Sequence, residues 1–207
     1  MVSAPQTLKL AQAVREAGFF ARLGGEGVGM ACPGALRVQG ADALSFVHSQ
    51  VTNEVEGLAS GEGNYSARVT LQGQLVELFS AHRLDSDSGP EMWLVLERGR
   101  VASLVAEFEA ILFADQVELA DVSLDYRWST LQGPDSAVVL DRVVPRVGDS
   151  WSDCPTYGLV MAEASSAPRG TLVFNRSLGG DLGFLIAVPR SDPESLALEE
   201  RLAREAA

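Results

Sequence analysis

The hydrophobic positions of this chain change period several times along its length. Segments in which apolar and polar residues alternate predict half-buried strands, and segments in which apolar residues recur every three or four positions predict amphipathic helices. Strands are predicted at 36–38, 65–71, 75–84, 92–96 and 117–122. Helices are predicted at 5–18, 43–51 and 100–113. Hairpins mixed with helices indicate an α+β fold rather than a regularly alternating parallel α/β sheet.

A short element occurs twice and indicates an internal duplication. Val-Gln-Gly-Ala-Asp-Ala begins at Val38, and Leu-Gln-Gly-Pro-Asp-Ser begins at Leu131. In each copy a strand is predicted to end at Gln-Gly, and an aspartate, Asp42 or Asp135, is placed to cap the next helix with its carboxylate. The chain therefore reads as two similar halves, each a strand, a capped helix, a hairpin, a strand and a helix.

The domain organisation follows from this repeat. Residues 1–29 are predicted to form an N-terminal helix and a Gly-rich connector, and 30–207 one domain with two interleaved pseudo-repeats, about 30–122 and 123–207. The second copy contains a hairpin around 179–181 and a last helix that begins near Asp192. Ligands favour the openings that such paired halves leave where they meet.

Composition and charge narrow the classes of partner. The chain has 207 residues, a net charge of −12 and a single lysine, Lys9, which argues against binding to nucleic acid or to an anionic membrane surface. No run approaches the roughly 18 apolar residues that span a bilayer, and no signal peptide is recognisable, so a cytoplasmic location is expected. Cys32 and Cys154 lack metal-ligand spacing, so no metal site is expected. Free thiols are favoured, with a single disulfide as the alternative.

Glu77 is the best candidate for a catalytic group. It lies in an otherwise apolar stretch of the predicted hairpin, between Val76 and Leu78. A carboxylate facing an enclosed pocket could bind an amidine-like pair of N–H groups on a heterocycle, or transfer a proton. The alternative is that strand alternation directs Glu77 to solvent.

Four other residues have two interpretations each. Asp181 is either a turn residue or a second acidic group of a site. Three aromatic side chains could stack on a flat ring or could instead fill the core: Tyr65, Trp93 and Phe184.

The order of several motifs resembles a known superfamily. These motifs are Leu36-x-Val38-x-Gly40-x-Asp42-Ala43-x-x-Phe46, Thr52-Asn53-Glu54, Gly61-x-Gly63-x-Tyr65, Gln72-Gly73-Gln74, Leu131-Gln132-Gly133-Pro134 and Gly179-Gly180-Asp181-Leu182-Gly183-Phe184. Together they resemble the folate-binding superfamily of the glycine-cleavage T-protein (GcvT) and the YgfZ proteins, over roughly residues 30–190. The resemblance implies a GcvT-type folate-binding domain with tetrahydrofolate or a one-carbon derivative in a central opening. The ligand-binding residues that it implies are Thr52, Asn53, Tyr65, Glu77, Trp93, Asp181 and Phe184.

The sequence departs from the superfamily pattern at its acidic positions. The paired Asp of the aminomethyltransferases becomes Glu77-Leu78, and Leu185 stands where an acid would follow Gly-Phe. The Lys-Gly-Cys-Tyr-x-Gly-Gln-Glu motif of YgfZ proteins is absent, and the C-terminal β-barrel domain that superfamily members carry is expected to be absent.

Three functions are therefore predicted. The first is a tetrahydrofolate-binding YgfZ-like protein that supports iron–sulfur protein assembly or repair through a client protein. The alternatives are a folate-dependent aminomethyltransferase that uses Glu77, and a non-catalytic protein-interaction scaffold of the same fold.

Overall fold

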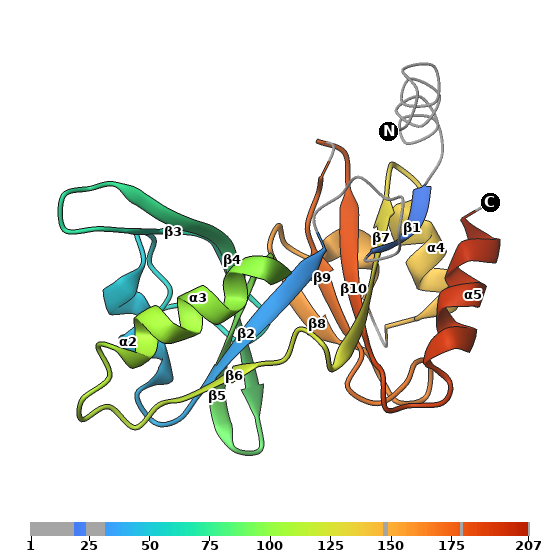
Figure 1. The fold of residues 1–207 in the computed structure, drawn as a ribbon. Helices are drawn as coiled ribbons and strands as arrows, with labels where there is room; N and C mark the ends of the chain where they lie inside the picture. The colour runs from blue at the N-terminus through green and yellow to red at the C-terminus, as the bar shows by residue number, and fades with distance from the viewer. Residues whose placement is uncertain (1–18, 24–31, 147–148, 179, 207) are drawn as a thin grey trace. The chain divides into compact units, whose positions relative to one another are not determined.

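The fold consists of two compact units, each built on its own five-stranded sheet (Figure 1). The computed structural model describes residues 19–23, 32–146, 149–178 and 180–206. Unit 2 comprises Cys32–Leu124 together with Thr156–Leu159, and unit 1 comprises the remaining described residues. The predicted helix at 5–18 and the Gly-rich connector at 24–29 lie outside the described residues.

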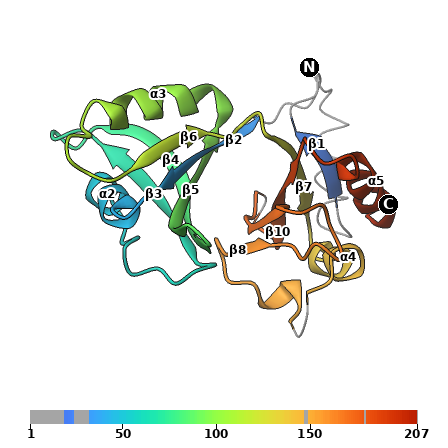
Figure 2. The same cartoon turned by 90° about the horizontal axis from the view of Figure 1, so that it is seen from below.

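Unit 2 has the strand order β3-β4-β5-β2-β6, with every neighbouring pair antiparallel. Its strands are β2 (Pro33–Gln39), β3 (Gly63–Val69), β4 (Leu75–Ser86), β5 (Gly89–Glu97) and β6 (Glu118–Asp121). Two helices, α2 (Ala43–Gln50) and α3 (Arg98–Glu109), pack against one face of this sheet (Figure 2). Phe46 and Phe108 meet edge to face between the helices, with ring centroids 5.3 Å apart.

Strand alternation gives the sheet of unit 2 two different faces. The helix-covered face carries buried apolar side chains, among them Leu36, Phe79 and Leu94. The helix-free face carries aromatic and polar side chains from the same strands: Tyr65, Ser80, His82, Glu91 and Trp93.

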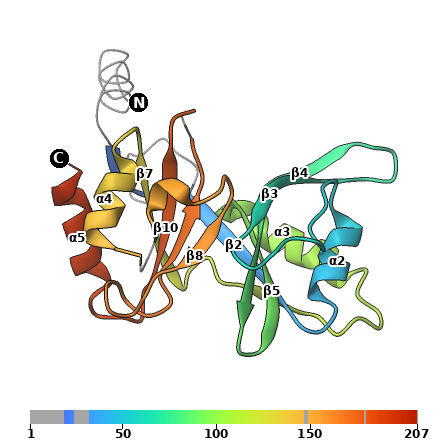
Figure 3. The ribbon, with the colours of Figure 1, turned by 180° about the vertical axis from the view of Figure 1, so that it is seen from behind.

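Unit 1 has the strand order β1-β7-β10-β9-β8. Its strands are β1 (Phe19–Leu23), β7 (Tyr126–Gln132), β8 (Leu159–Met161), β9 (Leu172–Asn175) and β10 (Gly183–Pro189). Helices α4 (Ser136–Val143) and α5 (Ser195–Glu205) pack together against one face of it (Figure 3). A short 3-10 turn, η1 (Trp151–Asp153), adds the buried Trp151 to the same core.

The predicted α+β fold class is confirmed, and several element boundaries differ from the prediction. β1 was not predicted, and it pairs with β7 in antiparallel register. α3 begins at Arg98 and ends at Glu109, earlier at both ends than predicted. α5 begins at Ser195, and the Asp192 carboxylate accepts the backbone N–H of Glu194 in the turn that precedes the helix. Among the described residues, no helix is long and apolar enough to cross a bilayer.

The predicted capping chemistry of the repeated element is wrong. Asp42 and Asp135 occupy the N-cap positions of α2 and α4, but neither carboxylate accepts a helix N–H. Instead the chain turns at a glycine with positive φ, and the carbonyl of Gly40 accepts the N–H of Ala43. The Asp42 carboxylate is then free to accept the backbone N–H of Gln116 at 2.7 Å, which ties down the loop before β6.

Candidate functional site

The sequence-predicted site residues are divided between the two units. Those in unit 2 are Thr52, Asn53, Tyr65, Glu77 and Trp93. Those in unit 1 are Asp181 and Phe184.

Thr52 and Asn53 hold the outer edge of β3. The backbone N–H of Thr52 donates to the carbonyl of Ala67, and the Thr52 hydroxyl accepts the N–H of Ala67 at 3.1 Å. The Asn53 side chain donates to the carbonyl of Tyr65 at 2.6 Å. These bonds supply partners to an edge strand that would otherwise present open backbone groups. The Thr-Asn pair therefore sets the position of Tyr65.

Tyr65 lies on the helix-free face of the sheet and is 39% exposed. Its ring stacks on that of Tyr157, with centroids 5.9 Å apart and planes 19° apart. Tyr157 has a φ of 61°, a left-handed conformation that is costly for a residue with a side chain. Its carbonyl lies 2.8 Å from Nδ1 of the buried His82. Sequence reasoning missed Tyr157, because it lies far from Tyr65 in the chain and no motif marks it.

Glu77 lies on the opposite face of the sheet from Tyr65. In the β3–β4 register Glu77 pairs with Arg68 and Tyr65 pairs with Ser80, so the two side chains leave the sheet on different sides. The Glu77 side chain is 16% exposed, and Oε2 accepts a hydrogen bond from Nε of Arg100 on α3 at 2.7 Å. This hydrogen bond, with the attraction between the charges, raises the pKa of Arg100.

Glu77 therefore faces neither bulk water nor the Tyr65 ring. Its carboxylate is matched by a guanidinium, and a parallel pair, Arg68 with Glu107, joins β3 to the same helix. The arrangement ties the β3–β4 hairpin to α3. Oε1 of Glu77 accepts the backbone N–H of Leu78 at 3.1 Å, so both carboxylate oxygens have partners within the protein.

Trp93 shares the helix-free face with Tyr65 but is only 3% exposed. Its indole N–H donates to Oε2 of the buried Glu91 at 3.2 Å. The other oxygen of Glu91 accepts the side-chain amide of Gln39 at 2.6 Å. Trp93 is thus part of a satisfied, buried hydrogen-bond group rather than an open aromatic surface.

In unit 1 the two predicted residues have contrasting environments. Asp181 is exposed in the loop that joins β9 to β10. Phe184, the second residue of β10, is fully buried and meets Trp151 edge to face, with ring centroids 5.8 Å apart. Phe184 therefore fills the core, the second of the two interpretations open from the sequence.

Gln132 is a residue whose contacts sequence reasoning did not anticipate. The side chain is buried, with Nε2 donating to Thr130 Oγ1 at 2.8 Å and to the carbonyl of Arg176 at 3.1 Å. Oε1 accepts the backbone N–H of Leu178 at 2.8 Å. Gln132 therefore holds the β9–β10 loop that carries Asp181. The sequence feature that could have drawn attention to Gln132 is its position in the repeated Gln-Gly element.

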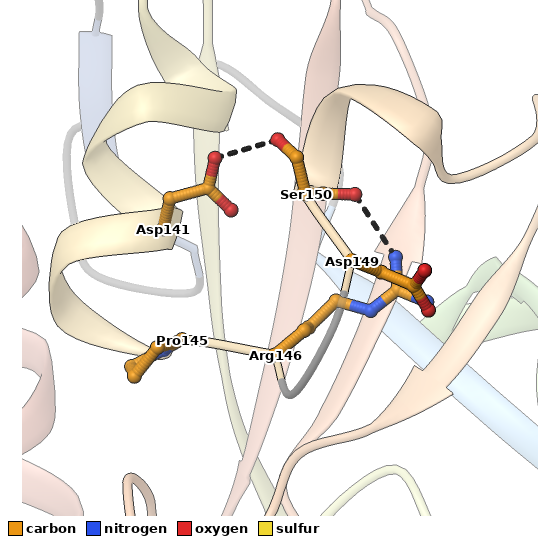
Figure 4. A pocket seen from close by; sticks show the side chains of 5 residues that line it. All are labelled: Asp141, Pro145, Arg146, Asp149 and Ser150. Atoms are coloured by element: carbon orange, nitrogen blue, oxygen red, sulfur yellow. Dashed lines mark hydrogen bonds and ion pairs between the residues drawn. The ribbon is translucent and has the colours of Figure 1, made fainter.

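A cavity of about 330 Å³ lies between the end of α4 and η1 in unit 1 (Figure 4). The Asp141 carboxylate accepts the Ser150 hydroxyl at 2.6 Å, and Arg146 donates to the Ser150 carbonyl at 3.1 Å. None of the predicted site residues lines it. The polar side chains of Asp141 and Arg146 therefore bond to Ser150 rather than present themselves to a ligand.

Within the described residues, no group of three or more His, Cys, Asp or Glu side chains is arranged to hold a metal ion. Both cysteines are free thiols, as expected. Burial raises the pKa of the Cys154 thiol, and the nearby Arg146 acts in the opposite direction with a smaller effect.

The thiol of Cys154 is expected to react slowly in the folded protein. Only the thiolate attacks a disulfide reagent, and a raised pKa lowers the thiolate fraction at any pH below it. In a Cys32→Ser variant, modification by such a reagent at pH 8 should be slow, should accelerate toward higher pH, and should become fast on unfolding in urea. Equally rapid modification before and after unfolding would show that Cys154 is accessible.

Comparisons with known proteins find similarity to a family profile and to aminomethyltransferases. A family profile described as the GCVT N-terminal domain matches residues 26–204. An aminomethyltransferase of Exiguobacterium sibiricum is 24% identical over 163 residues, which cover 79% of this chain and 43% of that protein. An aminomethyltransferase of Shouchella clausii is 30% identical over 110 residues, 53% of this chain and 29% of that protein. The chain thus spans less than half the length of these relatives.

Two solved structures resemble the fold. The glycine cleavage system aminomethyltransferase T from Bartonella henselae matches with a TM-score of 0.74 and 20% identity, over 94% of this chain and 48% of that chain. A chain of the heterotetrameric sarcosine oxidase from Corynebacterium sp. U-96 matches with a TM-score of 0.57 and 14% identity, over 99% of this chain and 95% of that chain.

Proposed function

The chain belongs to the GCVT N-terminal domain family, and from this premise we propose that it binds tetrahydrofolate or a one-carbon derivative. The observation that carries the proposal is the family match over 26–204, a range that includes every predicted site residue. Similarity to aminomethyltransferases supports one-carbon chemistry as the context of binding.

The geometry favours Tyr65 as the residue that contacts the pterin ring. The Tyr65 ring is partly exposed, and the Tyr157 ring stacks on it. The hydrogen bonds from Thr52 and Asn53 fix the strand that carries it. A pre-positioned aromatic ring loses little conformational entropy when a flat ligand stacks on it.

The same geometry argues against catalysis by Glu77. Its carboxylate is paired with Arg100 on the other side of the sheet, and Leu78 stands where the family has a second acid. A general base must reach the proton that it removes, and Glu77 is separated from the Tyr65 ring by the sheet itself. We therefore propose ligand binding without proton transfer by Glu77.

A calorimetric titration of the protein with tetrahydrofolate or folinic acid tests this function. Tyr65→Leu is expected to lower the affinity by roughly three- to tenfold, the usual contribution of an aromatic pair. Tyr65→Phe, which keeps the ring, and Glu77→Gln should bind like the parent protein. Absence of binding at millimolar ligand would refute the proposal. A Glu77→Gln variant that loses folate-dependent one-carbon transfer would instead favour the aminomethyltransferase alternative.

A second candidate, a subunit that acts through protein contacts, is favoured by one specific observation. The match to a chain of a heterotetrameric enzyme spans nearly the full length of both chains. On this hypothesis the chain forms a stoichiometric complex with a larger catalytic partner and does not itself bind folate. The iron–sulfur client implied by the YgfZ resemblance would be one such partner, and reduced iron–sulfur enzyme activity in a deletion strain would support it. Unchanged activities there, together with folate binding by the isolated chain, would favour the first proposal.

A further inference from the structure

Tyr157 has an unusual backbone conformation. Its φ of 61° lies in the left-handed region, and among the residues that the structure describes it is the one residue other than glycine with a positive φ. A residue with a side chain adopts this conformation at a cost and keeps it only where the surrounding structure enforces it. Backbone strain of this kind is concentrated at functional sites.

Hydrogen bonds at two points hold the short segment that carries Tyr157. This segment, Thr156–Leu159, belongs to unit 2, although the residues before and after it belong to unit 1. The carbonyl of Tyr157 lies 2.8 Å from Nδ1 of the buried His82. Because a carbonyl oxygen only accepts, this hydrogen bond requires the imidazole proton on Nδ1. Two residues later, the backbone N–H of Leu159 donates to the carbonyl of Gly61 at 2.9 Å.

The close approach of this segment to β3 depends on Gly63. In the β3–β4 register Gly63 lies opposite His82. A Cβ at Gly63 would collide with the carbonyl oxygen of Tyr157 and would lie 2.6 Å from the carbonyl oxygen of Ala81. Both are backbone atoms, so a larger residue at this position would displace either the Tyr157 segment or β4. Gly63 thus provides the space in which His82 and the Tyr157 carbonyl meet.

The segment places the Tyr157 ring against that of Tyr65. Tyr65 lies two residues beyond Gly63 on β3, so its side chain leaves the sheet on the side where Gly63 meets the segment. The two rings stack with centroids 5.9 Å apart and planes 19° apart. Because φ sets the direction of a side chain relative to the preceding residue, an ordinary negative φ at Tyr157 would aim its ring elsewhere.

We propose that Tyr157 is a positioning residue for the Tyr65 ring. Its left-handed backbone, held by His82 and permitted by Gly63, sets the ring that orders Tyr65 for stacking on a flat ligand. Ordering an aromatic ring before binding lowers the entropic cost of binding. The ligand part of this inference rests on the proposed folate binding, whereas the ordering of Tyr65 does not.

Two substitutions separate the ring of Tyr157 from its backbone. Tyr157→Asn removes the ring but keeps the left-handed conformation, which asparagine adopts more readily than tyrosine. Tyr157→Phe keeps the ring and is the matched control. The urea midpoint of Tyr157→Asn should stay close to that of the parent protein, because relief of backbone strain offsets the lost ring contact. A lower midpoint with unchanged folate affinity would show a structural role alone and would overturn the proposal.

Fluorine NMR reports on the Tyr65 ring without a ligand. The chain has three tyrosines, Tyr65, Tyr126 and Tyr157, so labelling with 3-fluorotyrosine introduces three probes. In Tyr157→Asn the Tyr65 resonance should sharpen and shift toward that of free fluorotyrosine, whereas in Tyr157→Phe it should stay near its parent position. Tyr126 lies in unit 1 and is the internal control. An unmoved Tyr65 resonance in Tyr157→Asn would overturn the positioning role.

Titration with tetrahydrofolate tests the link to the ligand. Tyr157→Asn should bind roughly three- to tenfold more weakly, and Tyr157→Phe should restore the affinity. Combined with Tyr65→Leu, Tyr157→Asn should cause little further loss, because Tyr157 acts through Tyr65.

The remaining outcomes distinguish the parts of the proposal. A full additional loss of affinity in the double variant would overturn the positioning role, since Tyr157 would then contact the ligand itself. A shifted Tyr65 resonance with unchanged affinity would overturn the link to the ligand. If the parent protein binds no folate, the proposed function fails, and the fluorine spectra still decide whether Tyr157 orders Tyr65.

Discussion

Gly40→Ala is expected to lower the free energy of unfolding by about 3–5 kcal/mol, the sum of a backbone term and an overpacking term. Gly40 has a φ of 119°, a conformation that residues with a side chain rarely adopt. An added Cβ would lie 2.0 Å from the carbonyl oxygen of Gln116 and 2.9 Å from its carbonyl carbon. These are backbone atoms of a loop that Asp42 holds in place, so they cannot move aside cheaply.

Gly89→Ala is the matched control for this result. Gly89 has a similar φ of 114°, but nothing lies within 4 Å of an added Cβ. It should therefore show the backbone term alone, about 1–2 kcal/mol. Urea unfolding followed by circular dichroism measures both variants. Equal losses of unfolding free energy in the two variants would show that the loop before β6 moves aside without cost. Close packing at Gly40 would then contribute nothing to stability.

Phe184→Ala is expected to destabilise the protein by about 3–5 kcal/mol, the range for deleting a buried aromatic ring. Phe184 is 0% exposed and packs edge to face on Trp151 in the core of unit 1. The alanine would leave a cavity that the surrounding strands and helices cannot close. Thermal and urea unfolding measure the loss.

Phe113→Ala provides the control for Phe184, because it deletes the same atoms from a ring that is 93% exposed. Its effect should stay within about 0.5 kcal/mol. Phe184→Leu should cost less than about 1.5 kcal/mol, because it keeps most of the volume. If Phe184→Ala left stability intact and weakened only folate binding, the ring would be a ligand contact rather than part of the core.

The contrast between Phe184 and Tyr65 shows where sequence reasoning stopped. Both were candidates for stacking on a flat ring; Tyr65 lies in a strand predicted at 65–71, and Phe184 lies in the hairpin predicted around 179–181. One is fully buried and the other is partly exposed and stacked on Tyr157. Burial depends on what packs against a strand face, and neither the helices of unit 1 nor the segment that carries Tyr157 is adjacent to these residues in the chain.

Glu77 illustrates the same limit for charge. Its apolar sequence neighbours indicated either an enclosed pocket or an exposed strand face. The structure shows a third environment, the helix-covered side of the sheet with Arg100 as partner. The hairpin register, which contains an irregularity between Arg68 and Val69, and the placement of α3 together decide this. Neither can be read from local periodicity.

By itself, the sequence determined the α+β class, most strands and helices to within a few residues, and the twofold use of the Gln-Gly-x-Asp element. These follow from hydrophobic periodicity and from the special backbone freedom of glycine, both of which act over a few neighbouring residues. Only the tertiary structure decided that Asp42 binds Gln116 instead of capping a helix, that Glu77 pairs with Arg100, and that Gln132 bonds to the β9–β10 loop whereas Gln39 bonds to Glu91. Each of these depends on which distant segment lies opposite a side chain, and in the last case on a single position, Gly183 rather than Glu91, across the sheet.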